Sequence, residues 1–265
     1  MGTLIKLAPR EIHLWLAFYE EISIELHPAY RQLLSAKERQ QEHKFLFATD
    51  RRRYLITRVL VRTVLSRYAP IDPIAWVFTA NTYGRPEIAN PEVRGTGLSF
   101  NLSHTRSLVV LGIKGIGALG VDVENIAARR AALDVADRFF APEEVTALRA
   151  IPPQERQRRF FEYWTLKESY IKARGMGLSL PLEKFSFHYP HDGAVGIDID
   201  PELADDAARW QFWQLQPRPE YLVAVCSEGT DAAPSTLVTR VITPAVCETV
   251  TAMPVLRASP WSRPE

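Results

Sequence analysis

Residues 160–174 read FFEYWTLKESYIKAR, and a glycine, Gly175, follows them directly. Apolar and charged side chains recur here at helical spacing, which predicts a long amphipathic helix that ends at the glycine. Trp164, Glu168 and Lys172 are each four residues apart and share one face of this helix. A tryptophan on the same face as an acid and a base indicates a partly buried pair. The alternative is an ordinary surface Glu–Lys pair, which contributes little.

The stretch Gly120-Val-Asp-Val-Glu124 alternates between apolar and acidic residues and predicts a short strand. Asp122 and Glu124 would then lie side by side on one face, where they repel each other unless a cation lies between them. An isolated pair of this kind is more often a solvated strand face. Together with Glu168, however, the two carboxylates would form a set of hard oxygen ligands of the kind that Mg²⁺ prefers.

The remaining elements mix helices and strands without a regular βαβ repeat, which is typical of the α+β class. Ser35 and Glu38 form a capping-box pattern ahead of a helix, and a second helix is predicted for residues 50–68. Further strands are expected at residues 12–19, 98–103, 108–113, 185–188 and 221–226. From Gly229 onward, regularly placed prolines predict a Pro/Thr/Ala-rich tail, residues 229–265, appended to the core.

The overall composition excludes several classes of protein. With 32 Lys and Arg against 31 Asp and Glu, the net charge of +1 argues against a protein that wraps nucleic acid or lies on an anionic membrane. We find no apolar run of membrane-spanning length and no signal peptide, and the two cysteines are too few for a disulfide framework. We therefore expect a cytoplasmic location. Locally, the charges of residues 37–67 sum to a net charge of +6, which would suit the binding of one small anionic ligand.

Two further motifs invite a functional reading. Asn101-Leu-Ser103-His104 lies at a strand end, where serine and histidine can bind an anion, although a structural turn is the alternative. Residues 115–120 match G-x-G-x-x-G but lead into a predicted strand rather than a helix, so we expect no dinucleotide site. Neither a nucleophilic Ser–His arrangement nor a P-loop is present.

Three motifs, and their order along the chain, resemble those of the 4′-phosphopantetheinyl transferases, in particular the larger type that activates surfactin synthetase. They are Phe100-Asn-Leu-Ser-His104, Gly120-Val-Asp-Val-Glu124 and Trp164-Thr-Leu-Lys-Glu168-Ser-Tyr-Ile-Lys172. Tyr83-Gly-Arg85-Pro86 is similar to a fourth, weaker motif in which lysine is usual, and Asp50-Arg-Arg-Arg53 to an arginine-bearing helix start. The resemblance implies two similar α+β halves about a pseudo-twofold axis, residues 1–117 and 118–228, with the active site in the cleft between them and the metal site in the second half.

The resemblance also implies an activity. Such enzymes move the phosphopantetheine arm of coenzyme A to a serine of an apo acyl or peptidyl carrier protein, release adenosine 3′,5′-bisphosphate and depend on Mg²⁺, or Mn²⁺. The chain would be a monomer. Its metal ligands would be Asp122, Glu124 and Glu168. Glu168 would deprotonate the carrier serine directly or through a metal-bound water, with Asp122 as second choice.

The remaining roles also follow from the resemblance. Lys172 would bind the pyrophosphate and assist the leaving group, and His104 completes the expected catalytic set. Contacts to coenzyme A would come from Arg53, Arg85, Pro86, Ser103, His104, Lys167 and Lys172. Lys37 and Arg39 are weaker candidates for the 3′-phosphate.

Two other functions stay open from the residues. The chain could be a non-catalytic module that binds coenzyme A or a nucleotide, although the presence of all three carboxylates and Lys172 argues against this. It could also be a Mg²⁺-dependent pyrophosphate hydrolase that uses water in place of the carrier serine.

Overall fold

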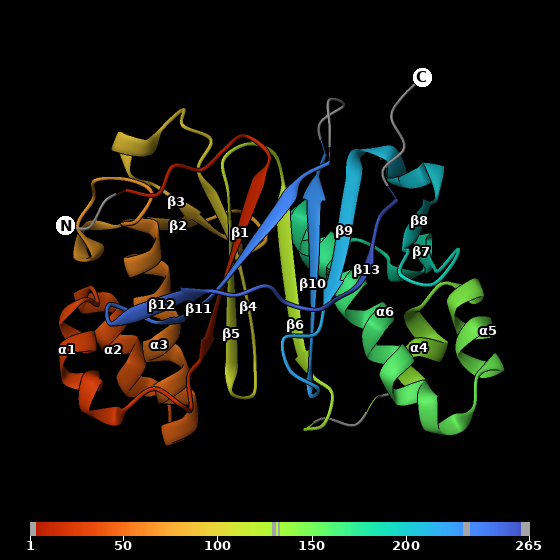
Figure 1. Cartoon of the computed structure of the whole chain (residues 1–265), viewed down its shortest axis with the longest axis horizontal. Coiled ribbons are helices and arrows are strands. Elements are labelled where there is room, and N and C mark those ends of the chain that lie inside the picture. Colours follow the sequence, from red (N-terminus) through yellow and green to blue (C-terminus); the bar gives the residue numbers. More distant parts are fainter. Residues whose placement is uncertain (1–3, 129–130, 132, 230–233, 261–265) are drawn as a thin grey trace. The chain divides into compact units, whose positions relative to one another are not determined.

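The computed structural model describes residues 4–128, 131, 133–229 and 234–260. The chain divides into two compact units, which Figure 1 shows with their elements labelled. The first unit comprises Met1–Asn81, Pro86–Ile116 and Leu237–Ala252, and the second comprises Thr82–Arg85, Gly117–Thr236 and Met253–Glu265. Each unit contains helices and a β-sheet, which confirms the predicted α+β class. Among the described residues, no helix has the length and apolar character needed to cross a bilayer.

The first unit contains a five-stranded sheet with the order β12-β11-β1-β5-β4 and a small β2–β3 hairpin. Its elements are β1 (Glu11–Phe18), α1 (His27–Gln32), α2 (Ala36–Lys44), α3 (Ala48–Leu65), β2 (Phe78–Ala80), β3 (Pro86–Ile88), β4 (Ser99–Thr105), β5 (Leu108–Lys114), β11 (Thr236–Thr243) and β12 (Cys247–Val250). Apolar side chains of α3 share one core with Trp15 of β1 and Leu111 of β5. The capping box is confirmed, since Ser35 and Glu38 exchange both of its bonds at the start of α2.

The second unit contains a four-stranded antiparallel sheet with the order β13-β9-β10-β6 and a β7–β8 hairpin. Its elements are β6 (Leu119–Asn125), α4 (Leu133–Phe139), α5 (Pro142–Ala150), α6 (Pro153–Arg174), β7 (Phe185–His188), β8 (Gly196–Ile199), β9 (Trp210–Leu215), β10 (Tyr221–Glu228) and β13 (Val255–Ala258). The long helix α6 packs on β6 and β10. Its residues Phe161, Leu166 and Tyr170 share a core with Leu222 of β10.

Helix α6 is the element that the opening stretch predicts, but it begins seven residues earlier, at Pro153. Proline suits the first turn of a helix, because the amide hydrogen that it lacks would have no partner there. The helix ends as expected, since Gly175 adopts a left-handed conformation with φ of 68°.

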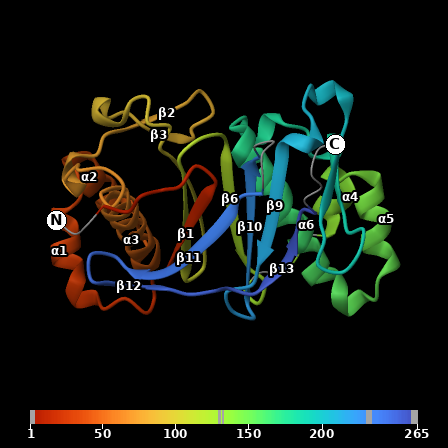
Figure 2. The ribbon, with the colours of Figure 1, turned by 45° about the horizontal axis from the view of Figure 1, so that its top comes forward.

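The prediction of an appended tail is wrong for the described residues beyond Gly229. Strand β11 lies beside β1 within the first sheet, as Figure 2 shows, and β13 pairs with β9 in the second. Ile242 of β11 belongs to the first core and is 7% exposed. Prolines 234, 244, 254 and 260 flank these strands rather than interrupt them. The β-branched residues between the prolines are therefore able to form strands.

Candidate active site

Asp122 and Glu124 project from β6 toward the face that α6 covers. In the β6–β10 ladder, Asp122 lies opposite Ala224 and Glu124 lies opposite Leu222. Opposed residues share a face of the sheet, and both of these partners belong to the core that α6 helps to form. The two acidic residues are only 5% and 9% exposed. The alternative of a solvated strand face is therefore wrong.

Gly120 lets α6 approach this face closely. A Cβ atom at this position would lie 1.9 Å from the Ser169 carbonyl oxygen and 2.5 Å from the Ala173 nitrogen. Such distances are far below van der Waals contact, so only glycine fits between β6 and the helix backbone. The close approach brings the α6 side chains alongside the carboxylates of β6.

Lys172 is the residue of α6 that joins the helix to the acidic face. Its Nζ lies 2.7 Å from Oδ1 of Asp122, and the lysine side chain keeps 27% of its surface exposed. The sequence alternative paired Lys172 with Glu168 along the helix surface. The structure pairs it with Asp122, which lies 50 residues earlier in the chain, and its charge also acts on Glu168.

Glu168 lies one helical turn before Lys172 and is half-buried. Burial raises the pKa of its carboxyl from 4.5 to about 7; the negative charge of Asp122 adds to the rise, Lys172 opposes it, and Glu124 adds a smaller amount. The group therefore changes its protonation state near neutral pH in the metal-free protein. A carboxylate with this pKa accepts a proton far more readily than an ordinary glutamate.

This donor set suits a hard divalent cation chemically. The negative charges of Asp122 and Glu124 both raise the pKa of Glu168, and a cation among the three carboxylates would relieve that repulsion. Within the part of the chain that the structure describes, no group of three or more His, Cys, Asp or Glu side chains already has the arrangement of a metal site. The metal ligand set therefore stays a prediction that rests on donor chemistry.

Lys167 precedes Glu168 but faces a different environment, and its predicted role as a ligand-binding residue is corrected here. The side chain is fully buried with that of Glu144, and Lys167 Nζ lies 2.7 Å from Glu144 Oε2. The same nitrogen donates to the carbonyls of Leu182 and Phe185. Burial lowers the pKa of Lys167, while Glu144 opposes this shift. Lys167 thus fixes α6 to α5 and β7. Sequence analysis missed Glu144, whose only signal was the acidic first turn after Pro142.

Arg85 and Pro86, both predicted to contact coenzyme A, lie in different surroundings. Arg85 donates from Nη1 to the carbonyl oxygens of Lys172 at 3.0 Å and Ala173 at 3.5 Å, and from Nη2 to that of Leu119 at 3.3 Å. Its guanidinium therefore meets the end of α6 and the first residue of β6. Pro86 begins β3 and is half-buried.

Ser103 and His104 lie within β4, opposite Val110 and Val109 of β5. The predicted strand ended at Ser103, whereas β4 continues to Thr105. Successive side chains of a strand point to opposite faces. Ser103 is 5% exposed, whereas His104 is exposed. Both belong to the first unit, and their predicted phosphate contacts stay predictions. Of the two, only His104 offers an exposed side chain.

The basic region of residues 37–67 is largely engaged within the first unit. Arg39, Arg51 and Arg52 donate to main-chain carbonyls, Arg58 and Arg62 bind Glu38, Arg53 binds Asp50, and Arg67 binds Glu248. The local charge of +6 therefore overstates the charge that a ligand would meet. Arg53 keeps 31% of its side chain exposed, and Lys37 and Lys44 are exposed on α2.

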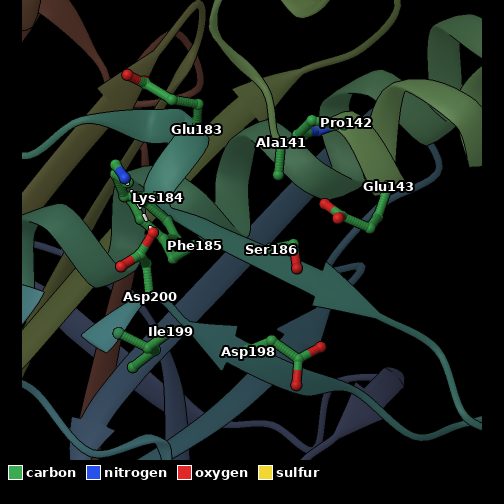
Figure 3. A pocket seen from close by; sticks show the side chains of 10 residues that line it. All are labelled: Ala141, Pro142, Glu143, Glu183, Lys184, Phe185, Ser186, Asp198, Ile199 and Asp200. Carbon is green, nitrogen blue, oxygen red and sulfur yellow. Dashed lines mark hydrogen bonds and ion pairs between the residues drawn. The ribbon is translucent and has the colours of Figure 1, made fainter. Parts of the chain in front are cut away.

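A pocket of about 390 Å³ lies elsewhere in the second unit, between the start of α5 and the β7–β8 hairpin. Figure 3 shows Ser186, Asp198 and Glu143 on one side of it and the Lys184–Asp200 ion pair on the other. None of the predicted site residues lines this pocket. It is therefore distinct from the α6–β6 site.

Comparison with known proteins places this geometry in a family. A model described as 4′-phosphopantetheinyl transferase superfamily matches residues 118–226. A second, described as 4′-phosphopantetheinyl transferase, N-terminal, matches residues 22–114. These two segments contain β6 and α6 on one side and α2, α3 and β4 on the other.

Several curated relatives cover most of the chain. A 4′-phosphopantetheinyl transferase of Bacillus subtilis is 34% identical over 199 residues, which is 75% of this chain and 84% of its own length. The 4′-phosphopantetheinyl transferase Sfp of Bacillus subtilis is 32% identical over 79% of this chain and 89% of its own. The 4′-phosphopantetheinyl transferase HetI of Nostoc sp. is 30% identical over 83% and 88%. The chain therefore belongs to the Sfp-type 4′-phosphopantetheinyl transferase family and is a transferase enzyme.

Proposed function

We propose that this enzyme transfers the 4′-phosphopantetheine arm of coenzyme A to a serine hydroxyl of an apo carrier protein, with Mg²⁺ as its metal. The observation that carries the proposal is the set of side chains where α6 packs against β6. There a carboxyl with a pKa of about 7, a buried carboxylate and a lysine ammonium lie together. These are an acid–base group and charges of both signs, which a phosphoryl transfer needs for positioning and electrostatic stabilisation.

The proposed step forms one bond and breaks one. The carrier serine oxygen attacks the phosphorus that bears the pantetheine arm, and the pyrophosphate P–O bond breaks. Adenosine 3′,5′-bisphosphate leaves, and Glu168 takes the serine proton. Asp122 is the second candidate for this role. The raised pKa of Glu168 in the metal-free protein supports this choice, because it makes the carboxylate a stronger base than an ordinary glutamate.

Lys172 would stabilise charge on the pyrophosphate oxygens as the bond breaks. Its ammonium is partly exposed and is held at its present position by Asp122. Asp122, Glu124 and Glu168 would hold Mg²⁺, which when bound neutralises negative charge on the phosphates. These residue roles rest on the chemistry of the side chains and on the family.

In the first unit, exposed and polar side chains would bind the rest of coenzyme A. His104 at the end of β4 and Arg53 at the start of α3 are accessible to its phosphates. Ser103 and Pro86 are further candidates, the latter beside the nucleotide. The pseudo-twofold relation of two halves, the placement of the site between them, the monomeric state and the cytoplasmic location all stay predictions.

Intact-protein mass spectrometry tests the proposal. The enzyme is incubated with coenzyme A, Mg²⁺ and an apo carrier protein, and the mass of the carrier is followed over time. We expect the carrier to gain one phosphopantetheine, with adenosine 3′,5′-bisphosphate appearing in equal amount. Release of free phosphopantetheine with an unlabelled carrier would favour the hydrolase instead. Binding of coenzyme A without any turnover would favour the non-catalytic module.

A further inference from the structure

The C-terminal end of α6 presents main-chain carbonyls that the helix itself does not satisfy. The last four carbonyls of any α-helix have no partner further along the helix. In α6 the Ile171 carbonyl accepts from the amide of Gly175, which ends the helix in a left-handed conformation. The carbonyls of Lys172 and Ala173 come next, and they therefore need donors from elsewhere in the fold.

Arg85 supplies these donors from a distant part of the sequence. Its Nη1 lies 3.0 Å from the Lys172 oxygen and 3.5 Å from the Ala173 oxygen. Its Nη2 lies 3.3 Å from the oxygen of Leu119, which is the first residue of β6. One planar guanidinium thus bonds the end of α6 and the beginning of β6 at once. Its positive charge also suits the negative end of the helix dipole.

The two elements that Arg85 joins carry the proposed catalytic groups. Lys172 donates its side chain to Asp122 of β6, while its own carbonyl accepts from Arg85. Gly120, the residue after Leu119, lets the helix backbone approach this part of β6. The separation of the Lys172 ammonium from the Asp122 carboxylate therefore depends on how α6 is fixed against β6 at this end.

We infer that Arg85 is a positioning residue, which acts on the reaction by holding Lys172 of α6 against β6 rather than by contact with the nucleotide. The inference rests on the proposed function for the roles of Lys172 and Asp122, but its contacts are those of the folded protein alone. A lysine at this position would carry the same charge, yet it lacks the planar fork that reaches two elements together.

Steady-state kinetics of Arg85→Ala and Arg85→Lys separate the two roles. For Arg85→Ala we expect kcat to fall by about tenfold to a hundredfold, because small displacements of catalytic groups cost that much. The KM for coenzyme A should change by less than about threefold. Arg85→Lys should recover part of the lost kcat. Arg94→Ala is the matched control, since Arg94 is an exposed arginine of the first unit, and it should leave both constants unchanged.

Hydrogen exchange of the ligand-free protein provides a second readout. In Arg85→Ala, amides of the last turn of α6 should exchange faster, while those of α3 should not change. A raised KM with an unchanged kcat would overturn the inference and assign Arg85 to the nucleotide. Unchanged kinetics and unchanged exchange would overturn it as well. If the wild-type enzyme failed to label a carrier, the proposed function would fall, whereas the exchange measurement would still decide whether Arg85 fixes α6.

Discussion

Glu168→Gln should make the protein more stable while it removes the activity. Glutamine has the shape of the protonated glutamic acid, so it preserves packing but cannot ionise. Burial and the neighbouring Asp122 raise the pKa of Glu168 from 4.5 to about 7, which means that folding disfavours its charged form. The native glutamate thus lowers the free energy of unfolding whenever the pH is high enough to ionise it.

The magnitude follows from the pKa difference. At about 1.4 kcal/mol for each tenfold change in proton affinity, a rise from 4.5 to about 7 corresponds to an upper limit of roughly 3–4 kcal/mol. The sign is that of a raised acid pKa: wild-type stability is fully present below pH 4.5 and is lost as the pH rises through about 7. The advantage of the glutamine variant should therefore be near zero at pH 4.5 and largest at pH 8.

Thermal unfolding of the metal-free proteins at pH 4.5, 6 and 8 measures this difference. For a chain of this size, each kcal/mol corresponds to about 2–4 °C in the unfolding midpoint. Glu155→Gln is the control, because Glu155 is exposed in the first turn of the same helix and should shift the midpoint by a degree or two only. Mg²⁺ should stabilise the wild type more than Glu168→Gln. If the stability difference between Glu168→Gln and the wild type is the same at pH 4.5 and pH 8, folding does not raise the pKa of Glu168.

Three further substitutions test other parts of the structure. Lys167→Met should destabilise the protein by about 3–5 kcal/mol in denaturant unfolding, because it leaves Glu144 buried without its partner; a change confined to the KM for coenzyme A would instead restore the ligand-binding role. Ile242→Ala should cost about 2–4 kcal/mol, whereas Val250→Ala, at a position 65% exposed, should cost little; equal effects would mean that β11 does not belong to the core. Gly120→Ala should lower both stability, by about 1–3 kcal/mol, and kcat, and a variant with wild-type values of both would contradict the close approach of α6.

The local patterns predicted the elements of the site well. Alternation in residues 120–124 and helical spacing in residues 160–174 led to β6 and α6, which are the elements that carry Asp122, Glu168 and Lys172. Such patterns indicate which face of an element is apolar, so they predict the element and the face that it buries. They do not report which elements pack together. For this reason the sequence alone could not show that Lys172 pairs with Asp122 rather than with Glu168 on the same helix.

The errors have the same physical origin. Arginines counted as a basic region donate to carbonyls and buried carboxylates, and these partners depend on the tertiary fold. Lys167 lies beside Glu168 in a motif, yet one residue along a helix turns a side chain by about 100°, which sends Lys167 into the core. In the C-terminal segment, proline frequency suggested an appendage. What decided the structure was the placement of the prolines at the ends of β11 and β13.

The most direct test of the central claim is the mass of an apo carrier protein after incubation with coenzyme A and Mg²⁺, measured in parallel for the wild type and Glu168→Gln. We expect the wild type to add one phosphopantetheine to each carrier. We expect Glu168→Gln, while folded and at least as stable at pH 8, to label the carrier at least about a hundredfold more slowly. A glutamine variant that labels the carrier at nearly the wild-type rate would contradict the role of Glu168, and an unlabelled carrier with the wild type would contradict the transfer itself.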